Sequence, residues 1–87
     1  MTHDFRFIQA LVTELLDDLD GIPGQVKDSL RGNILAGEPE ITFEAICSWI
    51  DELDLGISSE FYEKLKRVAC LLGTGHLEVE SLRAHIE

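Results

Sequence analysis

The sequence predicts an all-α fold, a compact bundle of four to five short helices in a single domain spanning residues 1–87. Apolar residues recur at intervals of three and four through most of the chain, which is the period of a helix with one buried face. Alternation of apolar and polar residues, the pattern of a half-buried strand, is absent. Glycine and proline interrupt the apolar pattern at spacings that suit short helices joined by tight loops.

The first two helices are predicted from apolar stripes that end at glycine. The first stripe predicts a helix over residues 3–20 that stops at Gly21, and its members are Phe5, Ile8, Val12, Leu15, Leu16 and Leu19. Pro23 suits the first turn of a second helix, because the N–H that proline lacks would be unpaired there in any residue. The second stripe runs to Gly37, and its members are Val26, Leu30, Ile34 and Leu35.

A third helix is predicted to begin with Thr42 as its N-cap, after a loop closed by Pro39, and to end at Gly56. Its buried face carries Phe43, Ile46, Cys47, Ile50 and Leu53, and Glu44, Ser48, Asp51 and Glu52 fall on the opposite face. Trp49 lies at the boundary between the two faces. Two roles stay open for Trp49, the centre of the core or a half-exposed anchor for a partner.

Ser58 or Ser59 is predicted to cap a fourth helix that stops at Gly73. The buried face of this helix carries Phe61, Leu65, Val68, Ala69 and Leu72, and the outer face carries Lys64, Lys66 and Arg67. A short fifth helix after Gly75 is expected to cover the core with Leu77, Val79, Leu82 and Ile86.

Acidic residues are concentrated between residues 38 and 63, where no lysine, arginine or histidine occurs. The eight acids of this segment are Glu38, Glu40, Glu44, Asp51, Glu52, Asp54, Glu60 and Glu63. The whole chain has a formal net charge of −10. Such a chain is a poor ligand for nucleic acid or anionic membranes, whose affinity comes from lysine and arginine. A basic protein is the partner that this charge favours.

Metal sites and catalytic sites are not predicted. Asp18 and Asp20 fall at two ligand positions of a calcium loop, but Leu16 and Lys27 would occupy its first and twelfth positions, where the ion needs carboxylates. His3, His76, His85 and the two cysteines lack the spacing of zinc ligands. His76 and His85 are expected at the surface of the last helix. The carboxylates lie on outer helical faces without a pocket to separate their pKa values, so we expect no enzymatic activity and no cofactor.

The two cysteines are expected to be reduced in a cytoplasmic protein. Cys47 lies on the buried face of the third helix, where it should act as a small apolar residue. Cys70 falls on a polar arc near Lys66 and Arg67, which leaves two interpretations, a functional thiol or packing beneath the last helix. No apolar run approaches the length of a transmembrane helix.

The tripeptide Asp28-Ser29-Leu30, in an acidic helical chain, resembles the phosphopantetheine attachment motif of acyl carrier proteins. In that family the modified serine opens a helix beside a negative recognition surface. Here Ser29 is expected inside the helix that begins at Pro23, with Arg31 and Gly32 after it. Modification of Ser29 is therefore an alternative hypothesis.

From Gly37 onward the order of features resembles the MafI family of immunity proteins, which are small acidic helical antidotes to bacterial polymorphic toxins. The matching elements are Gly37-Glu38-Pro39, Ala45-Ile46-Cys47, Asp51-Glu52, Ile57-Ser58, Phe61-Tyr62 and Leu65. The match covers about half of the chain. The resemblance implies non-catalytic binding to the toxic C-terminal domain of a cognate toxin, often a nuclease. A nuclease presents a basic cleft to phosphates, which an acidic helical face can occupy.

The sequence thus predicts an immunity protein that neutralises a basic toxin domain by electrostatically assisted binding. The predicted partner-binding residues are Glu38, Glu40, Glu44, Trp49, Asp51, Glu52 and Asp54, with Asp17, Asp18 and Asp20 as a second acidic patch. Phe7 and Leu11, at the edge of the first stripe, are a candidate homodimer patch. An acidic regulatory adaptor or nucleic-acid mimic that binds a host protein is a further alternative.

Overall fold

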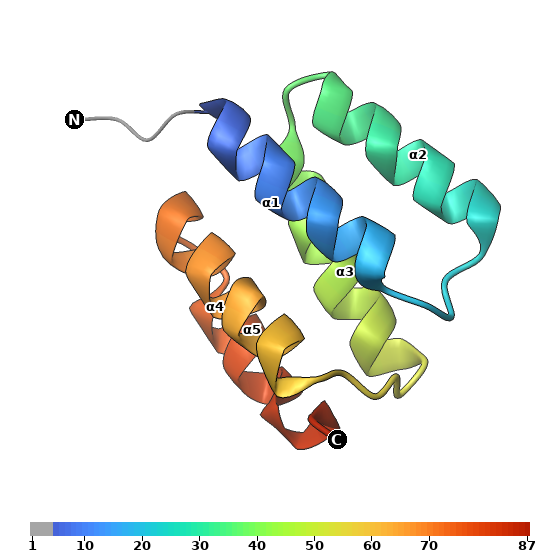
Figure 1. Ribbon diagram of the computed structural model, residues 1–87, viewed down its shortest axis with the longest axis vertical. Helices are drawn as coiled ribbons and strands as arrows, with labels where there is room; N and C mark the ends of the chain where they lie inside the picture. Colours follow the sequence, from blue (N-terminus) through green and yellow to red (C-terminus); the bar gives the residue numbers. More distant parts are fainter. Residues whose placement is uncertain (1–4) are drawn as a thin grey trace.

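A computed structural model describes residues 5–87, which form an all-α bundle (Figure 1). Its helices are α1 (Phe5–Asp18), α2 (Gly24–Leu35), α3 (Pro39–Glu52), α4 (Ser59–Leu72), α5 (His76–Ser81) and the short 3-10 helix η1 (Leu82–His85). Within residues 5–87 the one β-type pairing is an isolated parallel bridge between Ile57 and Ile86. The fold class predicted from the apolar spacing is confirmed. Residues 3 and 4 of the predicted first helix, and His3, lie outside the described residues.

Helix α1 is the element with neighbours on most sides, because it packs against α2, α3 and α4 (Figure 1). Its residues Val12, Leu15 and Leu16 have no exposed surface. Helix α5 packs on α4, and η1 closes the core against α3. Successive helices run up and down the bundle, so the starts of α1 and α3 and the ends of α2 and α4 lie at one end of the molecule, and α5 begins partway along α4.

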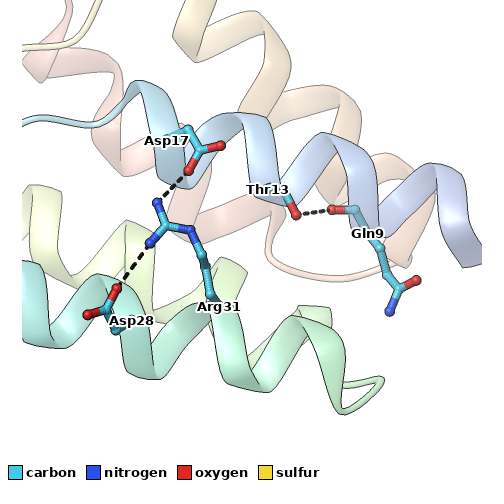
Figure 2. A network of polar contacts seen from close by, with 5 residues as sticks. All are labelled: Gln9, Thr13, Asp17, Asp28 and Arg31. Carbon is cyan, nitrogen blue, oxygen red and sulfur yellow. Dashed lines mark hydrogen bonds and ion pairs between the residues drawn. The ribbon is translucent and has the colours of Figure 1, made fainter.

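Polar contacts fix α1 against α2 at both ends of the pair. Near the start of α1, Gln9 Nε2 donates a hydrogen bond to the backbone oxygen of Ile34 at 2.7 Å. One turn later, Thr13 Oγ1 donates to the backbone oxygen of Gln9 at 2.8 Å (Figure 2). Near the end of α1, Asp17 accepts a hydrogen bond from Arg31 at 2.7 Å. The contacts of Gln9 with Ile34 and of Asp17 with Arg31 set the register of α1 on α2, whereas the Thr13 bond lies within α1.

Helix α3 begins at Pro39, so the prediction that Thr42 is its N-cap is wrong. Proline fits the first position of a helix because its φ is already helical and no intrahelical partner is needed for its nitrogen. Thr42 lies one turn inside α3 and is fully buried. Its Oγ1 donates a hydrogen bond to the backbone oxygen of Leu30 at 2.8 Å, which ties α3 to α2.

Other predicted boundaries of the helices are confirmed or shift by a few residues. Ser58 caps α4 by accepting a hydrogen bond from the N–H of Phe61 at 3.0 Å. Gly73 ends α4 in the left-handed conformation that glycine adopts without strain. Helix α1 stops at Asp18, ahead of Gly21. Helix α3 stops at Glu52, four residues before Gly56.

Three leucines that the stripes assign to the core are exposed. Leu35 is 85% exposed, Leu77 is 80% exposed and Leu53 is 44% exposed. Each lies at or next to a helix end, where the neighbouring helices no longer cover the surface. Helical periodicity predicts the angle at which a side chain leaves its helix, but it does not predict how far along the helix the neighbours extend.

The buried hydrogen bond of Thr42 gives a stability prediction. Thr42→Val keeps the shape of the side chain but removes the donor to the Leu30 oxygen, so we expect a loss of about 1–2 kcal/mol in the free energy of unfolding. Urea denaturation measures the difference. Ser48→Ala, on the exposed face of the same helix, is the matched control and should change stability by less than about 0.5 kcal/mol. Equal effects of the two substitutions would contradict the assigned role of Thr42.

Candidate functional site

The predicted acidic docking surface divides into two groups at opposite ends of α3. Glu38, Glu40 and Glu44 lie at or near its start, whereas Asp51, Glu52 and Asp54 lie at or beyond its end. Glu44 and Asp51, the nearest members of the two groups, are roughly 10 Å apart along the helix, and the outermost members are roughly 20 Å apart, so the two groups occupy different parts of the α3 surface. Trp49, in the last turn, is half-buried and packs against the edge of the core, so it is not the centre of the core, and its role as an anchor for a partner stays a prediction.

Asp18 and Asp20 lie at the same end of the bundle as Asp51 and Asp54. The α1–α2 loop approaches the α3–α4 loop so closely that a Cβ at Gly21 would lie 2.9 Å from Leu55 Cδ2. A cleft of about 400 Å³ beside this contact is lined by Asp18, Asp20, Glu60 and Lys64, among other residues. Three chain segments therefore form one surface, here termed the acidic end, which comprises Asp18, Asp20, Asp51, Glu52, Asp54 and Glu60.

Four acids at this end of the molecule occupy positions that helix electrostatics disfavours. Asp17 and Asp18 lie in the last turn of α1, and Asp51 and Glu52 lie in the last turn of α3. Neither turn contains a basic residue. The C-terminus of a helix carries a partial negative charge, so an exposed acid there typically costs about 0.3–1 kcal/mol.

The acids at the other end of α3 have a simpler explanation. Glu38 is the N-cap residue of α3, and Glu40 lies in its first turn. The partial positive charge of a helix N-terminus stabilises acids in such positions. Glu60 likewise lies in the first turn of α4. Local helix stability therefore accounts for Glu38, Glu40 and Glu60, but it does not account for the acids at the ends of α1 and α3.

Arg31 and Lys64 neutralise part of the charge at the end of α1. Arg31 reaches from α2 to Asp17 at 2.7 Å and also pairs with Asp28 at 3.3 Å (Figure 2). The hydrogen bond that Arg31 donates to the Asp17 carboxylate raises the pKa of Arg31 above its usual value. Lys64, which the sequence places on the outer face of its helix, turns toward α1 and lies 3.5 Å from both Glu14 and Asp18.

His85 is a residue of the acidic end that sequence reasoning missed. The prediction of a surface position is wrong, because only 10% of its side chain is exposed. Its Nδ1 lies 3.2 Å from the backbone oxygen of Leu55 and 3.2 Å from Asp54 Oδ1, and its Nε2 lies 3.7 Å from Asp51 Oδ1. The Leu55 oxygen and the Asp54 carboxylate can only accept hydrogen bonds, so Nδ1 carries a hydrogen. A proton on Nε2 would face Asp51.

The contacts of His85 hold the α3–α4 loop in an unusual conformation. Asp54 has a left-handed backbone with φ of 51°, which aspartate tolerates better than most residues. The backbone of the C-terminal segment adds two hydrogen bonds of 2.9 Å, from Ile57 N to His85 O and from Glu87 N to Ile57 O. No local pattern signals this contact, because it joins segments about thirty residues apart.

The two cysteines have different surroundings. Cys47 is buried as predicted, and burial, with smaller contributions from Glu78 and Glu44, raises the pKa of its thiol to about 12. Cys70 is exposed, so packing beneath the last helix is not its role. It lines a groove of about 550 Å³ between α4 and the C-terminal helices, beside Lys66, His76 and Arg83.

The remaining predicted sites are placed as follows. Ser29 is exposed in the middle of α2, whereas carrier proteins have their serine at the start of a helix. Phe7 is 41% exposed, but Leu11 packs partly against the core. Within residues 5–87, no group of three or more histidine, cysteine or acidic side chains is arranged to hold a metal ion. Among the described helices, none has the length and apolarity needed to cross a membrane.

The position of His85 predicts a local effect on the acidic end. His85→Ala should release the α3–α4 loop, because Asp54 and the Leu55 oxygen lose their shared partner. We expect faster hydrogen exchange at the amides of Ile57 and Glu87, measured by NMR. His76→Ala, at an exposed position, is the control and should leave both amides unchanged. Unchanged exchange in the His85 variant would show that the loop is held without the imidazole.

The cysteine environments predict selective alkylation. In the folded protein at pH 8, iodoacetamide should modify Cys70 and leave Cys47 unmodified until the chain unfolds, as peptide mass spectrometry can establish. Rapid alkylation of Cys47 in folded protein would contradict the burial.

The raised pKa of Cys47 also predicts how stability depends on pH. The ordinary pKa of a cysteine thiol is 9.0, so below pH 9 the buried neutral thiol favours the folded state, and this contribution is lost as the pH rises toward 12. A Cys47→Ala variant should therefore lose less stability over that pH range.

Comparisons with known proteins give no relative from which a function could be inferred. No protein-family model matches the chain. No curated protein matches it, and no solved structure matches its fold.

Proposed function

We propose that this protein is an immunity protein that binds a basic toxin domain, such as a nuclease, and neutralises it without catalysis. One observation carries the proposal. Asp18, Asp51 and Glu52 lie at helix C-termini, where they oppose the helix dipoles. Residues that break a local stability rule in this way are expected where function requires them.

A basic partner would relieve an electrostatic cost that the free protein carries. The six carboxylates of the acidic end face two nearby cations, Lys64 and His85, and His85 is charged only when protonated. Asp20 and Glu52 form no ion pair within residues 5–87. Lysine and arginine side chains of a partner would pair with these free carboxylates and would also interact favourably with the C-terminal ends of α1 and α3.

The mode of inhibition follows from the chemistry of a nuclease. Such an enzyme lines its cleft with cations that attract phosphates, and a surface of clustered carboxylates competes for the same cations. Long-range attraction would speed association, and it would weaken as salt screens the charges. The proposal assigns the protein to the cytoplasm, where a nuclease toxin would reach its substrate.

The test compares two charge-reversed variants that have the same net charge. Asp20→Lys with Glu52→Lys alters the acidic end, and Glu40→Lys with Glu44→Lys alters the other end of α3. The probe is a nuclease toxin domain sought among the genes that neighbour this one, and the lack of any such gene would count against the proposal. We expect the first variant to associate at least about tenfold more slowly in stopped-flow measurements and to lose protection of cells that express the toxin. The second variant should retain both properties.

Asp20 and Glu52 are chosen so that slower association of their variant cannot be attributed to loss of folding. Lysines near helix C-termini interact favourably with the dipole, so the first variant should be at least as stable as the original protein. Equal slowing in both variants would indicate non-specific attraction and would contradict a defined docking surface.

A mass increment on Ser29 after incubation with coenzyme A and a phosphopantetheinyl transferase would favour the carrier alternative. Capture of a host nucleic-acid-binding protein in place of the toxin domain would favour the adaptor.

A further inference from the structure

Exposed apolar side chains are concentrated away from the acidic end. Within residues 5–87, six large apolar side chains are substantially exposed, and five lie away from the acidic end: Phe5 (46%), Phe7 (41%), Leu35 (85%), Ile41 (44%) and Leu77 (80%). The first four belong to the starts of α1 and α3 and to the end of α2, which lie at one end of the bundle, and Leu77 belongs to the start of α5, which lies partway along α4 (Figure 1). We term these five residues the apolar end.

Short contacts join the segments that carry these residues. The ring of Phe5 lies over Gly37, 3.9 Å from the position of a Cβ there, which connects α1 to the turn after Leu35. The guanidinium of Arg67, in α4, lies over the ring of Phe7 at 5.2 Å. The turn before α5 lies against α3, because a Cβ at Gly75 would be 2.8 Å from the ring of Phe43.

The exposed apolar area has the size of an interface core. The five exposed fractions amount to about three fully exposed large side chains, or on the order of 450 Å². Summed over side chains of four helices, this area is comparable to that of the largest apolar patch on a typical monomer. A standard interface takes about 800 Å² from each partner, and its rim is polar. The patch and its polar surroundings can supply that area.

We infer that the occupant of the apolar end is a second copy of this chain, bound about a twofold axis. The charge distribution selects this arrangement. At a net charge of −10, two copies repel one another, and the repulsion is greatest where two acidic ends would meet. Contact through the apolar ends keeps the acidic ends as far apart as the molecule allows and leaves both of them accessible.

A twofold contact at this end is also electrostatically self-complementary. Arg67 borders the patch beside Phe7, and Glu38 and Glu40 border it beside Ile41. In a twofold interface each copy presents the same surface, so the Arg67 of one copy can face the acids of the other. The dimer therefore has an apolar centre with cations and acids at its rim.

Sedimentation velocity of the purified protein tests the inference without any toxin. We expect reversible dimers that become tighter as salt is added, because screening weakens the repulsion between copies. Binding of a basic partner would instead become weaker with salt, so the two associations are distinguishable. A monomer from micromolar to near-millimolar concentration, at high salt as well as low, would overturn the inference.

Substitutions at the two ends of the bundle locate the contact. Leu35→Glu and Leu77→Glu should each raise the dimer dissociation constant by about tenfold or more, because each loses apolar area twice and adds a charge in both copies. Leu53→Glu is the matched control, since Leu53 is the sixth exposed apolar residue and lies at the acidic end. All three positions are exposed, and circular dichroism checks that the variants are folded. An equal effect of Leu53→Glu would show that charge alone controls association and would refute the proposed contact.

Discussion

The burial of α1 against three neighbours is the constraint from which the rest of the structure follows. Val12, Leu15 and Leu16 have no exposed surface, and burying a side chain of this size contributes about 1.5–3 kcal/mol. This burial requires α2, α3 and α4 to lie alongside α1 over most of its length. Because the loops are short, successive helices must reverse direction. The end of α1 is therefore beside the end of α3 and the start of α4.

This arrangement gives the molecule two chemically different ends. At one end, the acids of α1, α3 and α4 converge, and the contact of Lys64 with Asp18 relieves part of their repulsion. At the other, apolar residues at helix ends lie beyond the reach of neighbouring helices. The acidic end concentrates charges that destabilise its own helices, which is the cost that a basic partner would offset. A protein of this size has little stability to spare for such features.

Local sequence rules predicted the features that depend on neighbouring residues. The buried stripe of α1, the cap at Ser58 and the left-handed glycine at Gly73 each follow from residues within a turn or two. The same rules failed at Thr42, which has the chemistry of an N-cap but whose hydroxyl bonds α2 instead. They failed again at Leu35 and Leu77, because periodicity contains no information about where a neighbouring helix ends.

The helical bundle, the strong acidity and the burial of Cys47 follow from the order of amino acids along the chain. Which acids share a surface is established only when the helices pack. Asp20 and Asp54 are separated by more than thirty residues, yet the contact of Gly21 with Leu55 brings their loops together. Glu44 and Asp51 belong to one helix, yet two turns of that helix separate them. The physical reason is that periodicity and capping depend on neighbours along the chain, whereas a docking surface depends on distances that only packing establishes.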